Sequence, residues 1–296
     1  KSRCNFSMKD NHIKKLKAGV MGWPVSHSLS PVLHSYWLSK YNINGSYEAI
    51  PVHPEDLEKA LTDLRKNIFR GVNLTVPHKE LALGYVDRID SMAKRIGAIN
   101  TILVEDSGVL VGSNTDAMGF TENLKDIVPE EVECGWSGKP AVVLGAGGAA
   151  RAVCVALIDI GVKEIRLVNR NSDRAFGLIE QVEGMSNLSD VYSWDNRSDA
   201  LSDAGLLVNT TSLGMTGKSP LHIDLTELPI NSTVHDIVYS PLETDLLINA
   251  QQRGNKVVDG LGMLLHQARP GFCSWFGTDP SVSSQLRQVV LATLSK

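Results

Sequence analysis

Short apolar runs alternate along the first part of the chain with longer segments of helical spacing. The apolar runs predict strands at 17–22, 46–52 and 71–76. Between them, apolar residues recur at helical intervals and predict helices at 31–41 and 54–67. Two further runs, 101–106 and 108–113, meet at a turn around Asp106 and Gly108 and predict a β-hairpin.

A second series of the same kind follows the segment 130–140, which we interpret as a loop. It predicts strands at 141–145, 164–168, 205–210, 232–238 and 256–260. One helix is expected to open at Asn171-Ser172 and to end near Gly184. The residues after 260 predict helices only, which we expect to return to the first series. This pattern is typical of an α/β fold with parallel sheets.

The length of 296 residues fits two domains. We expect the first at 1–115, with a loose tail at about 1–14, and the second at 116–258. The helices of 259–296 would complete the first domain.

The composition and the charge argue against two classes of function, nucleic-acid binding and membrane insertion. The net charge is −4 and the basic residues are scattered, which argues against nucleic acid as a partner. The most apolar stretch, 141–162, is interrupted by Arg151 and Asp159, so it predicts a buried strand and helix and not a membrane span.

The cysteines show neither a CxxC pair nor metal-ligand spacing: Cys4, Cys134, Cys154 and Cys273. Free thiols, no metal site and a reducing compartment are therefore expected. The N-terminal residues are polar and do not look like a signal peptide, so we expect a cytoplasmic protein.

The segment LGAGGAAR (144–151) lies between a predicted strand and a predicted helix. In that context a glycine-rich turn indicates dinucleotide binding. Gly145 permits the tight turn, Gly147 lets the backbone approach a pyrophosphate, and Ala150 allows close packing of helix on strand. Glycines that merely form a turn are the alternative.

The end of the next strand indicates which dinucleotide binds. An acid there would hold the ribose hydroxyl of NAD, but the strand ends in Asn169-Arg170-Asn171, with Arg174 one turn later. Guanidinium groups suit a 2′-phosphate by charge and geometry, so NADP is favoured over NAD. Solvated surface arginines are the alternative.

Three hydroxyls in GWPVSHSLSP (22–31) precede a predicted helix: Ser26, Ser28 and Ser30. Ser30 is expected to be the N-cap and Pro31 the first helical residue. A helix start with free N–H groups is also a site for an anion.

Two charged residues stand where predicted elements end. Lys79 follows a strand that Pro77 terminates, at the edge where ligands bind in parallel sheets. Asp116 stands where the second domain begins and can face a cleft between domains. Taken singly, Lys79 fits a solvated surface charge, and Asp116 fits the N-cap of a helix that starts near Ala117.

Together the motifs resemble one family, the shikimate dehydrogenases. They are SHSLSP, NLTVPHK, GAINTI, NTDAMGF, GAGGAAR, NRNSDRA, NTTSLGM, DIVYSP and GLGMLLHQA, in order, and they cover residues 17 to 277. The resemblance implies a substrate-binding α/β domain, an NADP-binding Rossmann domain and a cleft between them. It implies NADPH-dependent, reversible reduction of 3-dehydroshikimate to shikimate.

The resemblance also implies the site residues. Lys79 and Asp116 would be catalytic, and Ser28 and Ser30 would bind the substrate carboxylate. The ring hydroxyls would be met by Lys79, Asn100, Asp116 and Gln267, with Thr75 and Tyr239 nearby. The cofactor would be held by Gly145, Ala146, Gly147, Gly148, Ala149, Asn169, Arg170, Asn171, Arg174, Thr210, Ser212, Met215, Ile237, Gly260 and Met263.

The chain departs from the family pattern at a few positions. Ser35 replaces a usual asparagine, and Ala117 replaces a common glycine. Arg269-Pro270-Gly271 stands where the family continues a helix, and we expect the proline to kink or end that helix and to shift Gln267.

The alternatives are a quinate/shikimate dehydrogenase that prefers NAD and a non-catalytic NADP-binding sensor. The first would carry an acid near Asn169-Arg170, and the second would not need Lys79 with Asp116. A small-molecule substrate is the expected partner, in a monomer or a homodimer.

Overall fold

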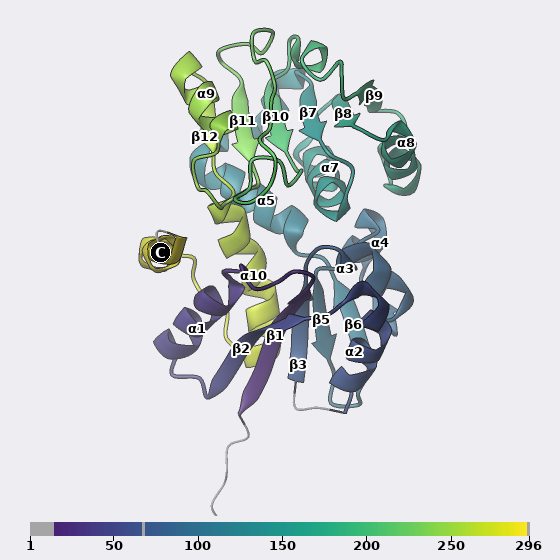
Figure 1. Cartoon of the computed structure of the whole chain (residues 1–296), viewed down its shortest axis with the longest axis vertical. Helices are drawn as coiled ribbons and strands as arrows, with labels where there is room; N and C mark the ends of the chain where they lie inside the picture. The colour runs from purple at the N-terminus through teal and green to yellow at the C-terminus, as the bar shows by residue number, and fades with distance from the viewer. Residues whose placement is uncertain (1–14, 67–68, 295–296) are drawn as a thin grey trace, which may run out of the picture.

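The structure, a computed structural model, describes residues 15–66 and 69–294. It has two lobes, each built on a six-stranded sheet (Figure 1). The predicted tail at 1–14 and Cys4 lie outside the described residues.

The first sheet has the strand order β2-β1-β3-β5-β6-β4. Its strands are β1 (Leu16–Gly22), β2 (Gly45–Pro51), β3 (Phe69–Leu74), β4 (Arg88–Ile89), β5 (Thr101–Val104) and β6 (Leu110–Ser113). β1 runs parallel to both β2 and β3, while β5 is antiparallel to β3 and to β6, which confirms the predicted hairpin. The short strand β4 was not predicted.

The helices of this lobe are α1 (Ser30–Lys40), α2 (Leu57–Leu64), α3 (His78–Leu81) and α4 (Ser91–Ile96). Short 3₁₀ turns at Pro54–Asp56 and Ala82–Gly84 adjoin α2 and α3. α1 confirms the predicted helix, but its N-cap is Leu29 and not Ser30. The helix begins one residue earlier because the Ser28 hydroxyl accepts the Ser30 N–H at 3.3 Å, which satisfies that donor from outside the helix.

The second sheet is parallel throughout, in the order β12-β11-β10-β7-β8-β9. Its strands are β7 (Ala141–Leu144), β8 (Ile165–Asn169), β9 (Ser189–Ser193), β10 (Leu206–Asn209), β11 (Thr233–Asp236) and β12 (Lys256–Val258). This is the doubly wound order of a dinucleotide-binding Rossmann sheet. The edge strand β9 was not predicted.

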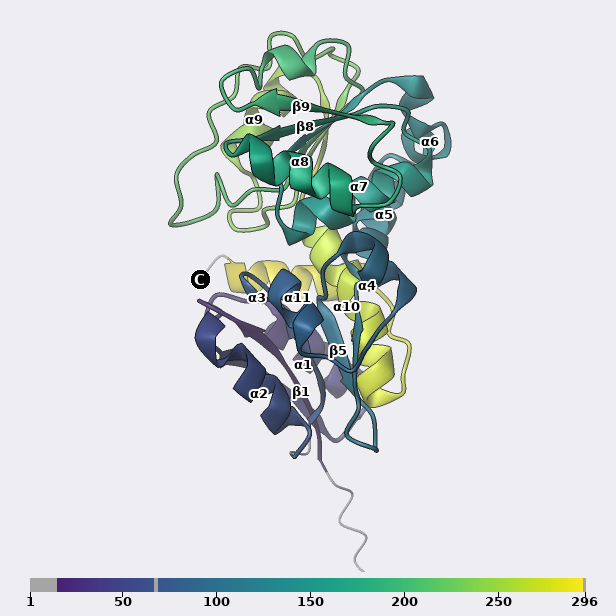
Figure 2. The same cartoon turned by 90° about the vertical axis from the view of Figure 1, so that its right-hand side faces the viewer.

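Helices α7 (Gly148–Ile160), α8 (Ser172–Gln181) and α9 (Asp245–Arg253) flank this sheet (Figures 1 and 2). The segment 130–140, expected to be a loop, instead lies mostly in α6 (Pro129–Glu133) and a 3₁₀ turn at Gly135–Gly138. Pro129 opens α6 from a position where its missing N–H costs nothing.

Two helices connect the lobes: α5 (Asp116–Ile127) and α10 (Leu261–Phe276). α10 runs from the second lobe into the first (Figure 1). The two helices pack very closely, since a Cβ on Gly119 would lie only 2.6 Å from the Cβ of Gln267. After α10, α11 (Ser284–Leu294) packs on the first lobe, where Leu286 shares a core with Leu33 and Trp37.

Of the two expected effects of Pro270, a kink or an early end of the helix, the early end is wrong. α10 continues through Pro270 to Phe276, with Phe272 and Trp275 almost fully buried. Gly271 lets the Trp275 ring lie against the backbone, because a Cβ there would be 2.9 Å from that ring. This buried surface outweighs the one helical hydrogen bond that the proline removes.

None of the helices in the described part of the chain has the length and apolar character that a membrane crossing needs. Within residues 15–66 and 69–294, no cluster of His, Cys, Asp or Glu is arranged to hold a metal ion. Cys134, Cys154 and Cys273 are free thiols.

Candidate active site

The site lies where the carboxyl ends of the two sheets meet. Gly148, which begins α7, faces Lys79 of α3 from the other lobe: a Cβ on Gly148 would lie 3.3 Å from the Cβ of Lys79. The glycine-rich turn after β7 and the lysine after β3 are therefore neighbours, although 65 or more residues separate them in the sequence.

Lys79 and Asp116 form an ion pair at this junction. Their side chains are 17% and 6% exposed, so both charges are largely withdrawn from water. Asp116 is the first residue of α5, where the helix dipole favours a carboxylate. The N-cap interpretation of Asp116 is wrong: Thr115 occupies that position, and the carboxylate is directed at Lys79 and Asn100.

Asn100 joins this pair to the connecting helix α10. Its amide nitrogen donates to Asp116 Oδ1 at 2.8 Å and to Gln267 Oε1 at 3.3 Å. Its amide oxygen accepts the backbone N–H of Thr115 at 2.9 Å, which fixes the orientation of the side chain. Thr115 Oγ1 in turn donates to the Gln267 carbonyl at 2.8 Å. Gln267 therefore lies in the site despite the proline three residues later.

The predicted carboxylate-binding serines stand at the start of α1. Ser28 is half-buried and Ser30 is buried. Burial raises the pKa of the neighbouring Tyr47 well above its usual value, and a hydrogen bond from Ser30 offsets part of that rise. Ser35 is exposed on α1, so the departure from the family pattern there does not alter the buried face of the helix.

Two further predicted substrate residues lie near the junction of the lobes. Thr75 follows β3 and meets the end of β1, with its N–H donating to the Met21 carbonyl at 2.9 Å. Tyr239 follows β11 in the second lobe, yet it packs against the core of the first lobe. Burial raises the pKa of Tyr239, so its hydroxyl stays protonated near neutral pH.

The glycine-rich turn has the tight backbone geometry expected of its glycines. Gly145 has φ +108°, a left-handed conformation that other residues rarely adopt. A Cβ on Gly145 would lie 2.8 Å from Thr210 Oγ1, so the turns after β7 and β10 touch. The Thr210 hydroxyl itself donates to the Leu144 carbonyl at 2.6 Å. Ala150 is fully buried against the sheet.

The other residues predicted to bind the cofactor surround this turn. Ala146 is buried, and Gly147 and Ala149 are half-buried. Ser212 and Met215 lie exposed in the loop after β10. On the opposite side, Gly260 packs so closely on Ile237 that a Cβ would lie 2.2 Å from its carbonyl oxygen, and Met263 is buried in the first turn of α10.

The predicted arginines lie at the tip of β8 in different arrangements. α8 opens at Asn171-Ser172 as predicted, and Asn171 caps it by accepting the Arg174 N–H at 3.0 Å. Asn169 donates to the Asn171 carbonyl at 2.8 Å, which tightens the turn. The Arg174 side chain lies over the glycine-rich turn and donates to the Ala146 carbonyl at 3.0 Å. Arg170 instead lies over the ring of Trp194.

One residue that bridges the lobes was missed by the sequence reading. Glu80, next to Lys79, lies 3.3 Å from an Nη of Arg174 and 3.7 Å from Nε of Arg151. Burial lowers the pKa of Arg151, and the Glu80 charge offsets part of that effect. Its arginine partners lie in the other lobe, so no local pattern around Glu80 signals the contact.

Comparison with known proteins agrees with this geometry. Residues 20–102 match the model of the shikimate dehydrogenase substrate binding domain, and residues 126–213 match that of the shikimate / quinate 5-dehydrogenase family. The chain is 53% identical to a shikimate dehydrogenase (NADP(+)) of Paramagnetospirillum magneticum over 277 residues, which cover 93% of this chain and 98% of that protein.

Solved structures give the same result for the fold. Shikimate 5-dehydrogenase from Thermus thermophilus, in complex with NADP(H) and shikimate, is 38% identical with a TM-score of 0.80, covering 93% of this chain and 98% of that one. Quinate dehydrogenase from Corynebacterium glutamicum, in complex with NAD, is 27% identical with a TM-score of 0.85, covering 94% and 99%.

The fold is thus common to enzymes with different cofactors and does not by itself identify the substrate. The identity over nearly the full length decides the family. The chain belongs to the shikimate dehydrogenases.

Proposed function

We propose that this protein catalyses the NADPH-dependent, reversible reduction of 3-dehydroshikimate to shikimate, and that Lys79 and Asp116 carry out its proton chemistry. The observation that carries the proposal is the ion pair of Lys79 with Asp116, held against the glycine-rich turn at the junction of the lobes. A substrate placed between that turn and the first lobe has an ammonium group at its reacting oxygen.

Lys79 acts on the oxygen of the reacting carbon. Reduction of a ketone places negative charge on that oxygen and requires a proton there. A desolvated ammonium stabilises the charge more strongly in the transition state than in the ground state. Asp116 holds the lysine in place, and Asn100 holds Asp116. NADPH, when bound, supplies the hydride.

The remaining substrate residues orient the ring. Ser28 and Ser30 donate hydroxyl hydrogen bonds to the carboxylate at the start of α1, where the helix dipole favours an anion. Asn100 and Gln267 already share a hydrogen bond and present their amides to the ring hydroxyls. Thr75 and Tyr239 border the same space from the two lobes.

The residues around β7 and β8 fit NADP. The left-handed Gly145 and the extended Gly147 leave the backbone open to a pyrophosphate at the start of α7. At the tip of β8, Arg170 and Arg174 supply positive charge for the 2′-phosphate, and no carboxylate occupies positions 169 to 171.

The domain boundaries stay a prediction: substrate binding in 1–115 and 259–296, and cofactor binding in 116–258. Their sheets fit this division, since β6 ends at Ser113 and β12 spans Lys256–Val258. We also propose a cytoplasmic protein, either a monomer or a homodimer.

A spectrophotometric assay tests the activity. Purified protein should oxidise NADPH when 3-dehydroshikimate is added, and should reduce NADP⁺ with shikimate. NADH should be a much poorer reductant. Faster turnover of quinate with NAD⁺ would favour the quinate dehydrogenase alternative, and tight NADP(H) binding without turnover would favour the sensor.

A further inference from the structure

The nucleotide edge of the second sheet contains an aromatic platform that the sequence motifs do not include. β8 and β9 run parallel, with Asn169 opposite Ser193 at their carboxyl ends. The next residues along each strand, Arg170 and Trp194, therefore leave the sheet side by side. This register places an indole ring beside the guanidinium proposed to bind the 2′-phosphate.

Arg170 depends on that ring for its position. Its guanidinium carbon lies 5.1 Å from the centre of the Trp194 ring. The side chain is exposed and makes no hydrogen bond or ion pair to any other residue in the described ranges 15–66 and 69–294. The indole is thus the contact that restricts where Arg170 points.

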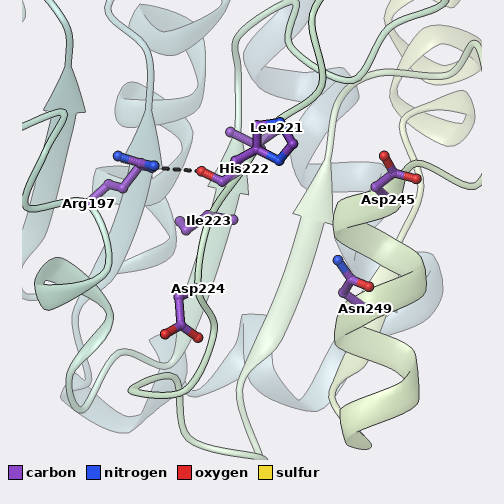
Figure 3. Close-up of a pocket in the computed structure, with 7 residues that line it drawn as sticks. All are labelled: Arg197, Leu221, His222, Ile223, Asp224, Asp245 and Asn249. Atoms are coloured by element: carbon purple, nitrogen blue, oxygen red, sulfur yellow. Dashed lines mark hydrogen bonds between the residues drawn. The ribbon is translucent and has the colours of Figure 1, made fainter.

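Trp194 is itself held by a second arginine. Arg197 Nη1 donates to the Trp194 carbonyl at 2.7 Å, and its Nε donates to the His222 carbonyl at 2.8 Å. Figure 3 shows the bond to His222. The Arg197 guanidinium also lies 5.3 Å from the centre of the Trp194 ring. Arg197 therefore restrains the backbone of Trp194 by a hydrogen bond and contacts its ring.

We infer that Trp194 is a positioning residue that sets the preference for NADP(H) over NAD(H) by holding Arg170 at the tip of β8. This inference rests on the proposed role of Arg170 as a ligand of the 2′-phosphate. A guanidinium that lies over an aromatic ring uses none of its N–H donors in that contact, so they remain free for phosphate oxygens. Because the ring orders Arg170 in advance, less freedom is lost when the phosphate binds.

Removing the Trp194 ring should have a small effect that is confined to the binding of NADPH. An exposed cation–π contact to tryptophan corresponds to about a two- to fivefold change in affinity. Trp194→Leu should therefore raise the KM for NADPH about two- to fivefold, while kcat and the KM for NADH stay unchanged. Trp194→Phe, which keeps an aromatic face, should recover part of the loss.

A double-mutant cycle with Arg170→Ala tests the inference. In the Arg170→Ala background, Trp194→Leu should cause no further loss with NADPH, because no guanidinium remains to be positioned. Tyr192→Leu is the matched control: it removes an aromatic ring from the same strand that contacts the core and not Arg170. It should lower stability without changing the ratio of the two KM values.

The possible outcomes separate the inference from the proposed function. If Arg170→Ala raises the KM for NADPH selectively and Trp194→Leu leaves it unchanged, the inference is overturned and the role of Arg170 is retained. The inference would also be overturned if Trp194→Leu raised the KM values for NADPH and NADH equally. The same holds if it raised the KM for NADPH by the same factor in the wild type and in Arg170→Ala. If Arg170→Ala left the ratio of the KM values for NADPH and NADH unchanged, the 2′-phosphate assignment and the inference would both be refuted.

Discussion

His34 should make the first lobe sensitive to acid. Its side chain is fully buried, and neither ring nitrogen has a hydrogen-bond partner within the described residues. The ring stacks on Tyr47 with centres 3.9 Å apart and lies among Trp37, Phe272 and Trp275. Burial lowers the pKa of His34 from 6.5 to about 3, so the folded protein keeps this histidine neutral.

The size of the effect follows from the two pKa values. The unfolded chain binds a proton at His34 below pH 6.5, while the folded chain does not until about pH 3. The stability that neutral His34 permits is therefore complete above pH 6.5 and is lost progressively as the pH falls toward 3. At pH 5 the loss is about 2 kcal/mol, at 1.36 kcal/mol per pH unit below the unfolded pKa.

Urea unfolding followed by tryptophan fluorescence measures this loss, since Trp37 and Trp275 lie in the same cluster. His34→Phe removes the titrating group and keeps a ring; any overpacking penalty acts equally at every pH. Between pH 8 and pH 5, the wild type should lose about 2 kcal/mol more than this variant.

Phe272→Leu serves as the control, because it alters the packing of the same cluster without removing a titratable group. It should show the wild-type dependence on pH at a lower overall stability. If His34→Phe and the wild type lose stability in parallel as the pH falls, the account of His34 as a buried neutral group is refuted.

Three other predictions concern the proposed roles. Ser28→Ala and Ser30→Ala should each raise the KM for shikimate about tenfold or more with little change in kcat, because a hydrogen bond to a charged group is worth roughly 1.5–3 kcal/mol; an unchanged KM in the double variant would leave these serines a structural role only. Arg170→Ala should raise the KM for NADPH and leave that for NADH nearly unchanged; equal increases would contradict the 2′-phosphate assignment. Asp116→Asn should lower kcat, and adding Lys79→Ala should lower it little further, since the pair acts as a unit; multiplied losses would show that the two residues act separately.

Much of the fold was predictable because buried strands and helices have a regular pattern of apolar residues. Strands β7 and β10 are buried along their whole length; β7 is uniformly apolar, and β10 is apolar up to its last residue, Asn209. The strand β9 was missed because it lies at the sheet edge, where its sequence SDVYS is mostly polar and only partly buried. Missing β9 also hid Trp194, which follows it.

The site was partly predictable for a different reason. Lys79 and Asp116 stand directly at the ends of elements, so the motifs located them, and the structure brings them together. The contacts of Glu80 with the second lobe are not predicted by any motif around Glu80. The early end predicted for α10 failed because local propensity at Pro270 is overridden by the burial of Phe272 and Trp275.

The most direct test of the catalytic account is the kcat of Lys79→Ala with saturating NADPH and 3-dehydroshikimate. Removal of one electrostatic donor at a reacting oxygen typically costs on the order of 10²–10³ in kcat. The account predicts a loss of that size with a comparatively small change in the KM for the substrate, and a circular dichroism spectrum like that of the wild type. A correctly folded Lys79→Ala enzyme with near-normal kcat would remove Lys79 from the mechanism and contradict the proposal.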